Sequence, residues 1–219
     1  MDQWFVPEHQ LALADQTVQN FVYDQRNQVE YKFNQLGFRS PEYSQDTSVV
    51  VVGNSISFGL GLAQEDTFGF KLSQQLGLQY NNFSFGGWLH ENHDHLYNIQ
   101  QLAKRDTDDI FVVQINNLDR CRIDSSTVKQ GNDSSWCQKR FLDWFEQVTQ
   151  ALKHRNTYFL YWDTCDYDLP TSVQQQILIN NKFHLDTSVP AHDMTFGLRS
   201  HHAVYQVLLS KLAKFSNRS

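Results

Sequence analysis

The chain has 219 residues, which is long enough to bury the core of one domain of ordinary size. Hydrophobic residues make up 40% and charged residues 19%, a composition that argues against a disordered chain. The 18 basic and 24 acidic residues give a net charge of −6, which argues against a nucleic-acid partner, because that role needs clustered Lys and Arg.

No targeting or membrane segment is predicted. Residues 1–4 lack the basic start and apolar run of a signal peptide, and no stretch approaches the roughly 18 apolar residues of a membrane span. Cys121 and Cys137 flank a polar loop and would pair in an oxidising compartment, but with Cys165 as an odd third residue we expect reduced thiols. The expected location is the cytoplasm, that of a host cell if the protein is viral, with no membrane partner.

Residues 1–46 differ in composition from the rest and are predicted to form a helical N-terminal extension. They are rich in Gln, Asn and aromatic residues. One or two helices are expected, ending near Gly37, and Pro41 bars helix further on. The segment is expected to act as a cap, as an oligomerisation arm or as a docking element. A homo-oligomer or an assembly contact through residues 1–46 is therefore left open.

Residues 47–219 alternate between strand-like and helix-like segments. The four valines of 49–52 form a β-branched, wholly apolar run, as is typical of a strand buried on both faces of a parallel sheet. The expected strands are 49–52, 79–85, 110–115 and 158–162, and the expected helices are 66–76, 90–103, 136–152 and 201–215. The segment 176–183 fits either state, and 119–135 is expected to be a polar loop. This alternation predicts a three-layer α/β sandwich with a mostly parallel sheet.

The residues that follow the first strand carry the first chemical motif, because ligands of open α/β sheets lie beyond the carboxyl ends of the strands. Residues 53–59 read GNSISFG. A small Gly53 lets the chain turn out of the sheet, so that Ser55 projects from a strand-to-helix turn. Its backbone N–H then faces the space where an oxyanion forms. A hydroxyl at that place attacks an acyl carbon if a base takes its proton.

This motif resembles the first block of the SGNH (GDSL-type) hydrolases, with Asn54 where that family usually has Asp. The resemblance extends from residue 47 to the end. Within the family, this part of the chain is similar to the short members found in marine phage and cyanobacterial genomes. It implies a flavodoxin-like fold, no cofactor and Ser55 as nucleophile. The second block of the family is similar to residues 82–87, which points to Gly87 as the second oxyanion donor. The implied substrate is a small ester or an acylated sugar.

The third block of the family, Gly-x-Asn-Asp, should follow the strand 110–115, where the chain reads NNLDR. Asn116 takes the place of the Gly and Leu118 that of the Asn. Asn117 can still donate its side-chain amide if the loop shifts by one residue. The alternative is that these asparagines only turn and cap the end of the strand.

The last block departs further from the family pattern, which places Asp and His three residues apart before the final helix. In the aligned register, Thr195 stands in place of the His and His192 in place of the Asp, and Thr cannot act as a base near neutral pH. Three substitutes are open. His192 itself is the first, with Asp193 beside it but unable to orient it, because neighbouring side chains diverge.

The second substitute is His201 or His202, from the first turn of the final helix, with Asp193 nearby. The third is a histidine of the segment 90–95, which reads HENHDH. That segment also invites a metal, since His90 and Asp94 would share a helix face. A solvated helix start explains it better, and no metal site is predicted.

Three functions follow. The first is a serine esterase or deacetylase that acts through Ser55. The second is a degenerate member of the family that binds a glycan, with Trp88, Tyr97 and Trp136 as stacking residues, or that serves as a structural component. The third is a nucleotide- or phosphosugar-binding domain in which the serines and glycines of residues 55–61 cradle an anion. The first is the expected function.

Overall fold

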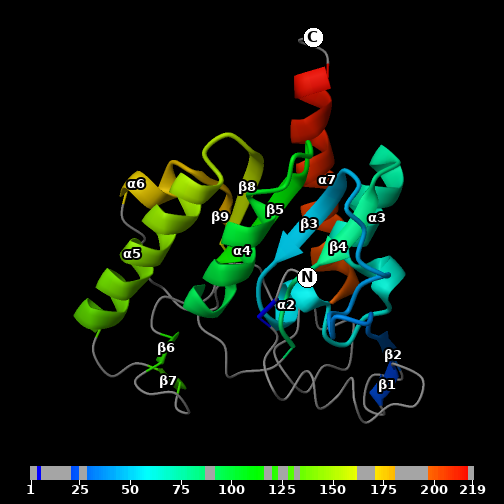
Figure 1. Ribbon diagram of the computed structural model, residues 1–219, viewed down its shortest axis with the longest axis horizontal. Coiled ribbons are helices and arrows are strands. Elements are labelled where there is room, and N and C mark those ends of the chain that lie inside the picture. Colours follow the sequence, from blue (N-terminus) through cyan, green and yellow to red (C-terminus); the bar gives the residue numbers. More distant parts are fainter. Residues whose placement is uncertain are drawn as a thin grey trace.

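A five-stranded parallel sheet between two layers of helices dominates the computed structural model (Figure 1). The order of its strands is β4-β3-β5-β8-β9, which is 2-1-3-4-5 when they are counted along the chain. The strands are β3 (Ser48–Val52), β4 (Gln79–Asn82), β5 (Ile110–Ile115), β8 (Asn156–Tyr161) and β9 (Ile177–Asn180). This order is that of the flavodoxin-like doubly wound fold, so the predicted fold class is confirmed.

The structure describes residues 4–5, 21–24, 29–86, 92–115, 120–122, 128–130, 134–161, 171–180 and 197–216. Besides the sheet, these residues form short elements: β1 (Phe21–Asp24), β2 (Val29–Lys32), α2 (Ser55–Phe58), η1 (Gln64–Asp66), η2 (Asn92–His95), β6 (Arg120–Arg122), β7 (Val128–Gln130) and α6 (Thr171–Gln174). The predicted polar loop contains the hairpin β6–β7, and the ambiguous segment 176–183 contains strand β9.

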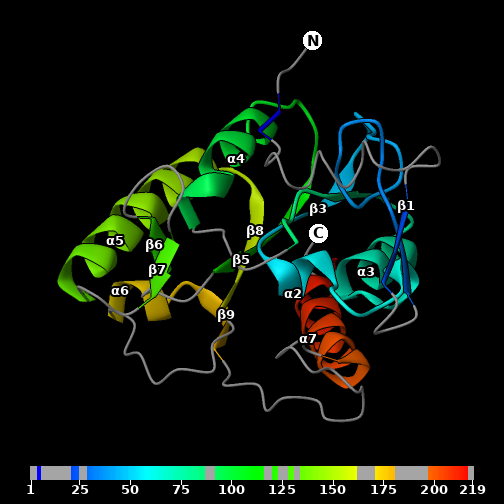
Figure 2. The same cartoon turned by 90° about the horizontal axis from the view of Figure 1, so that it is seen from below.

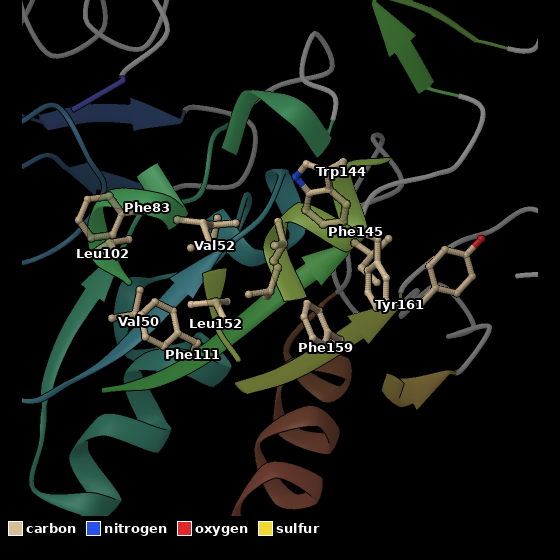
Figure 3. Close-up of a cluster of buried hydrophobic side chains, with 14 of the residues drawn as sticks. Val50, Val52, Phe83, Leu102, Phe111, Trp144, Phe145, Leu152, Phe159 and Tyr161 are labelled. Carbon is tan, nitrogen blue, oxygen red and sulfur yellow. The ribbon is translucent and has the colours of Figure 1, made fainter. Parts of the chain in front are cut away.

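The longer helices cover both faces of the sheet (Figure 2). The helices α4 (Leu96–Leu102) and α5 (Ser134–Ala151) lie on one face, and α3 (Phe68–Leu76) and α7 (Leu198–Ser216) lie on the other. Alternate residues of each strand point to opposite faces. Val50 and Val52 therefore enter the cluster under α4 and α5, whereas Val49 and Val51 enter the cluster under α3 and α7. Figure 3 shows the first of these clusters.

The helices expected within residues 1–46 are wrong for the described part of that segment. Strands β1 and β2 pair there as an antiparallel hairpin, with Val22 opposite Tyr31. The reason can be read in residues 29–33, where Tyr31 and Phe33 are buried while Glu30 and Lys32 are exposed. That period of two is the period of a strand, and the Gln- and Asn-rich surroundings obscured it.

The residues that follow this hairpin lie in the core of the α/β domain. Phe38 is 1% exposed, and its ring packs against that of Phe83 with the centroids 4.6 Å apart and the planes inclined by 56°. The hydroxyl of Ser40 donates to the carbonyl of Tyr80 and accepts from the N–H of Asn82. This part of the segment therefore packs on the edge strand β4. A domain boundary at residue 46 stays a prediction.

Cys137 lies buried in the first turn of α5 and is disulfide-bonded, so the expectation of reduced thiols is wrong for this residue. Within the described residues, no helix is long and apolar enough to cross a membrane. The cytoplasmic location stays a prediction, and because disulfides are rare in that compartment, Cys137 is the residue that tests it.

Candidate active site

Ser55 is the first residue of α2, a single helical turn directly beyond the carboxyl end of β3 (Figure 1). Asn54 is the N-cap, and its side-chain oxygen accepts from the N–H of Ile56 at 3.1 Å. Gly59 ends the turn in the left-handed conformation, with φ 79°. Ser55 is partly exposed between two buried neighbours. The chain thus places this hydroxyl where the strand order reverses, which is the ligand-binding crevice of such sheets.

The neighbouring strands β5 and β4 fix the turn through Ser57. The side-chain oxygen of Gln114 on β5 accepts from the N–H of Ser57 at 3.0 Å and from its hydroxyl at 2.7 Å. The side-chain amide of Asn82 on β4 donates to the carbonyl of Ser57 at 3.2 Å. Ser57, Gln114 and Asn82 are each 1% exposed, so these bonds form away from water.

Arg39 holds the far end of the turn. Its guanidinium donates to the carbonyls of Phe58 at 2.8 Å, Gly59 at 2.5 Å, and Leu62. The group also lies 4.4 Å from the ring centroid of Tyr31. Burial lowers the pKa of Arg39 to about 10, so the group is charged at neutral pH. Nothing in the sequence around Arg39 indicated this role.

His201, predicted as a base for Ser55, is engaged elsewhere. It is 1% exposed, and its Nδ1 accepts from the N–H of Phe68, the first residue of α3, at 3.2 Å. Burial, and to a smaller extent the charges of Arg39 and Lys71, lower the pKa of His201 to about 3. The ring is therefore neutral, and because Nδ1 is an acceptor, the proton sits on Nε2. In this state neither nitrogen offers a lone pair to the proton of Ser55.

His202, the neighbouring candidate, is exposed on α7. Its Nε2 lies 3.4 Å from the side-chain nitrogen of Gln206, and its ring lies 5.9 Å from that of Tyr205. Across the part of the chain that the structure describes, no hydrogen bond to the Ser55 hydroxyl is found from either histidine.

The other predicted site residues have different outcomes. Gly87, Asn117, His192 and Asp193 lie outside the described residues, so their roles stay predictions. The Asn54 side chain is engaged in capping α2. Of the histidine-rich segment 90–95, the described part is η2, in which the buried His95 stacks on the ring of Phe85 at 4.4 Å. Among described side chains, no group of three or more His, Cys, Asp or Glu is arranged to hold a metal ion.

A hollow of about 420 Å³ lies at the opposite, amino edge of the sheet, away from the Ser55 turn. It is lined by side chains from the segments that precede β3 and β5, namely Tyr43, Gln45, Gln101 and residues 104–107. Because chemistry in this fold belongs to the carboxyl edge, we do not assign the active site to this hollow.

The fold and the turn define a flavodoxin-like α/β sandwich with a serine at its switch point. Solved structures similar to the chain are SGNH or GDSL-type enzymes, so the predicted resemblance is confirmed as a resemblance. One is a carbohydrate esterase family 2 enzyme with a carbohydrate-binding domain from Corynascus thermopiles (Myceliophthora fergusii). The TM-score is 0.49 at 15% identity over 77% of this chain and 66% of that chain.

A second similar structure is TesA, with a TM-score of 0.46 at 14% identity over 76% of this chain and 98% of that one. A third is a lipolytic protein of the G-D-S-L family from Veillonella parvula, with a TM-score of 0.37 at 14% identity over 78% of this chain and 74% of that one. No protein-family model and no curated protein sequence matches the chain. At these scores the similar structures carry no argument about activity or substrate.

Proposed function

We propose that the chain is a serine ester hydrolase of SGNH type that acts through Ser55. The observation that carries the proposal is the way in which the Ser55 turn is held. Hydrogen bonds from Gln114, Asn82 and Arg39 reach it from three separate segments, and the hydroxyl itself stays partly exposed. A nucleophile needs this combination of fixed position and access, because orientation supplies a large share of the rate enhancement.

In the proposed reaction, the Ser55 hydroxyl oxygen attacks the carbonyl carbon of an ester. Its proton passes to a base and then to the departing alcohol, which leaves an acyl group on Ser55. Water, activated by the same base, then releases the acid and restores the hydroxyl. The backbone N–H groups of Ser55 and Gly87 are the proposed donors to the oxyanion. Loss of one such donor costs about 100- to 1000-fold, so the missing family Asn does not by itself preclude activity.

The base is proposed to be His192. The lone pair of His201 at Nδ1 is committed to the N–H of Phe68, and its low pKa makes it a poor acceptor of protons. His192 precedes the final helix in sequence, in the segment where the SGNH hydrolases that the chain resembles carry their base. Asp193 follows it directly and, as a sequence neighbour whose side chain diverges, is not proposed to orient it.

Labelling with a fluorophosphonate tests the proposal without a guess about the substrate. Such a probe bonds to a serine whose proton has an acceptor, and intact mass counts the adducts. We expect one adduct on the wild type, none on Ser55→Ala, and one on Ser210→Ala, which removes an exposed hydroxyl of α7. No adduct on folded wild type at neutral and alkaline pH, or an adduct that survives Ser55→Ala, overturns the proposal.

A second candidate function is glycan binding without catalysis, and one observation favours it. Tyr97 and Trp136 are 45% and 43% exposed, respectively, instead of forming part of the core. Each lies in the first turn of a helix, α4 or α5, that follows a strand of the parallel sheet, so both lie toward the same edge as Ser55. The guanidinium of Arg140 lies 5.7 Å from the centroid of the Trp136 ring.

Quenching of tryptophan fluorescence by oligosaccharides distinguishes the two functions. Binding that is lost in Trp136→Ala but retained in Ser55→Ala, together with no fluorophosphonate adduct, supports glycan binding alone. Absence of quenching at millimolar oligosaccharide eliminates this second candidate.

A further inference from the structure

A single polar residue interrupts the apolar run of the central strand β5. The strand reads IFVVQI, all six residues are buried, and Gln114 is 1% exposed. A buried amide is costly unless it is hydrogen-bonded, so its presence in a strand of this kind calls for a partner. The partner is Ser57, which is 57 residues away in sequence and two residues beyond Ser55.

The bond to the Ser57 N–H determines which donors of the Ser55 turn remain available. The first N–H groups of a helix have no acceptor within the helix. In α2, the Asn54 side chain takes the N–H of Ile56, and the Gln114 side chain takes that of Ser57. Among the described residues, no group accepts a hydrogen bond from the N–H of Ser55. That N–H is the donor that the proposed reaction needs for its oxyanion.

The side chain of Gln114 also packs tightly against Gly53, which joins the end of β3 to the Ser55 turn. A Cβ added to Gly53 would lie 2.7 Å from Cβ of Gln114 and 2.8 Å from the hydroxyl oxygen of Ser57. The glutamine side chain therefore lies directly against Gly53, in space that only a glycine leaves open. The end of β3, strand β5 and helix α2 therefore pack against one another through Gly53, Gln114 and Ser57.

The orientation of the Gln114 amide is fixed by its partners. Both groups of Ser57 that face it are donors to one oxygen, so a flipped amide would set its NH2 against an N–H. The Nε2 atom, in contrast, is buried without a hydrogen-bond partner. The acceptor oxygen is thus the part of the side chain that holds the turn.

We propose that Gln114 is a positioning residue: its side-chain oxygen fixes the Ser55 turn and leaves the Ser55 N–H as the donor directed at the oxyanion. This inference rests on the proposed function of Ser55. In this role the acceptor oxygen of Gln114 holds the turn, and the volume of the side chain does not. Gln114→Met keeps the length and removes the acceptor, whereas Gln114→Glu keeps an acceptor.

Two readouts on folded protein test the assignment: the rate of fluorophosphonate labelling, and hydrogen–deuterium exchange of a peptide that covers residues 53–59. For Gln114→Met we expect labelling to slow by about 10- to 100-fold, as for a nucleophile that is no longer held in place. Exchange in the peptide should rise at the same time. Gln114→Glu should bring both the labelling rate and the exchange of the peptide most of the way back to the wild-type values. Val148→Ala, which removes a buried side chain of α5 from the core, is the control for lost stability and should change neither.

The outcomes separate the two proposals. If the wild type takes no label, the proposed hydrolase is wrong, and the exchange of residues 53–59 alone decides whether Gln114 fixes the turn. If Gln114→Met lowers only the melting temperature, with labelling and exchange as in the wild type, the positioning role is overturned. The same holds if Gln114→Glu behaves like Gln114→Met in both readouts at a pH where the carboxyl group is ionised.

Discussion

His201 caps α3 through Phe68: its Nδ1 accepts from the Phe68 N–H at 3.2 Å, and the two rings stack with centroids 5.4 Å apart. The contact joins the first turn of the last helix to the first turn of α3, on the face of the sheet opposite α4 and α5. The first N–H groups of a helix have no acceptor within the helix, and His201 supplies one for Phe68. The histidine supports the fold, which explains why it is buried and neutral.

The His201 contact makes stability depend on pH. The pKa of a histidine is about 6.5 in an unfolded chain, and that of His201 is about 3 in the folded chain. Between these values the unfolded chain binds a proton that the folded chain does not, so stability falls as the pH falls. The contribution is complete above about pH 6.5 and is lost progressively toward pH 3, by about 1.4 kcal/mol per pH unit at most.

His201→Gln keeps an acceptor but does not titrate, so its free energy of unfolding should fall less steeply between pH 6.5 and 4 than that of the wild type. Urea unfolding at several pH values measures this difference. The exposed His202→Gln is the matched control and should keep the wild-type slope. Equal slopes for wild type and His201→Gln would contradict the low pKa of His201.

Arg39 is expected to be the largest single polar contribution to the stability of the Ser55 turn. Arg39→Met fills the site but leaves the carbonyls of Phe58, Gly59 and Leu62 without their donor. We expect a loss on the order of 3 kcal/mol in the free energy of unfolding. The free energy of unfolding of Arg39→Lys should lie between those of the wild type and Arg39→Met, because one ammonium cannot reproduce the fork of the guanidinium. Lys153→Met, at an exposed position, should stay within about 0.5 kcal/mol of the wild type. A loss that small in Arg39→Met would refute this role.

The sequence predicts the parts of this molecule that are decided locally. The apolar runs of β3 and β5, the helical spacing in α5 and the turn after Gly53 all follow from patterns within a few residues. The resemblance around Ser55 adds the fold, because a short motif at a strand end limits the topology.

The contacts that fix the site are not local, and the sequence does not indicate them. Arg39 reaches carbonyls about twenty residues further on, and His201 reaches an N–H that is 133 residues away in sequence. Gln114 did carry a signal, since one polar residue in an otherwise apolar strand calls for a partner. The identity of that partner, Ser57, depends on the pairing of β3 with β5, which only the tertiary structure supplies.

Gly53 is predicted to be intolerant of any side chain. Gly53→Ala places its Cβ against Gln114 at 2.7 Å, and overpacking of this kind typically costs about 1 to 3 kcal/mol. Thermal unfolding measures that loss, and slower fluorophosphonate labelling should accompany it, because the clash displaces the turn. Gly77→Ala is the contrasting variant: its Cβ would meet nothing within 4 Å, but its φ of +65° carries a strain of about 1 kcal/mol. It should destabilise without slowing the labelling. Labelling of Gly53→Ala at the wild-type rate would show that the contact with Gln114 does not hold the turn.

The disulfide of Cys137 predicts how many free thiols the unreduced protein carries. The chain has three cysteines, so if Cys137 is bonded within the chain, one thiol remains. Alkylation of the unfolded, unreduced protein should therefore add one group, and alkylation after reduction should add three, which intact mass resolves. Reduction should also lower the melting temperature, because the closed loop limits the unfolded chain. Cys137→Ser should expose a second thiol, that of the released partner, and should lose the response to reductant. Three alkylated thiols on protein purified without reductant would instead restore the reduced state expected from the sequence, and with it the case for the cytoplasm.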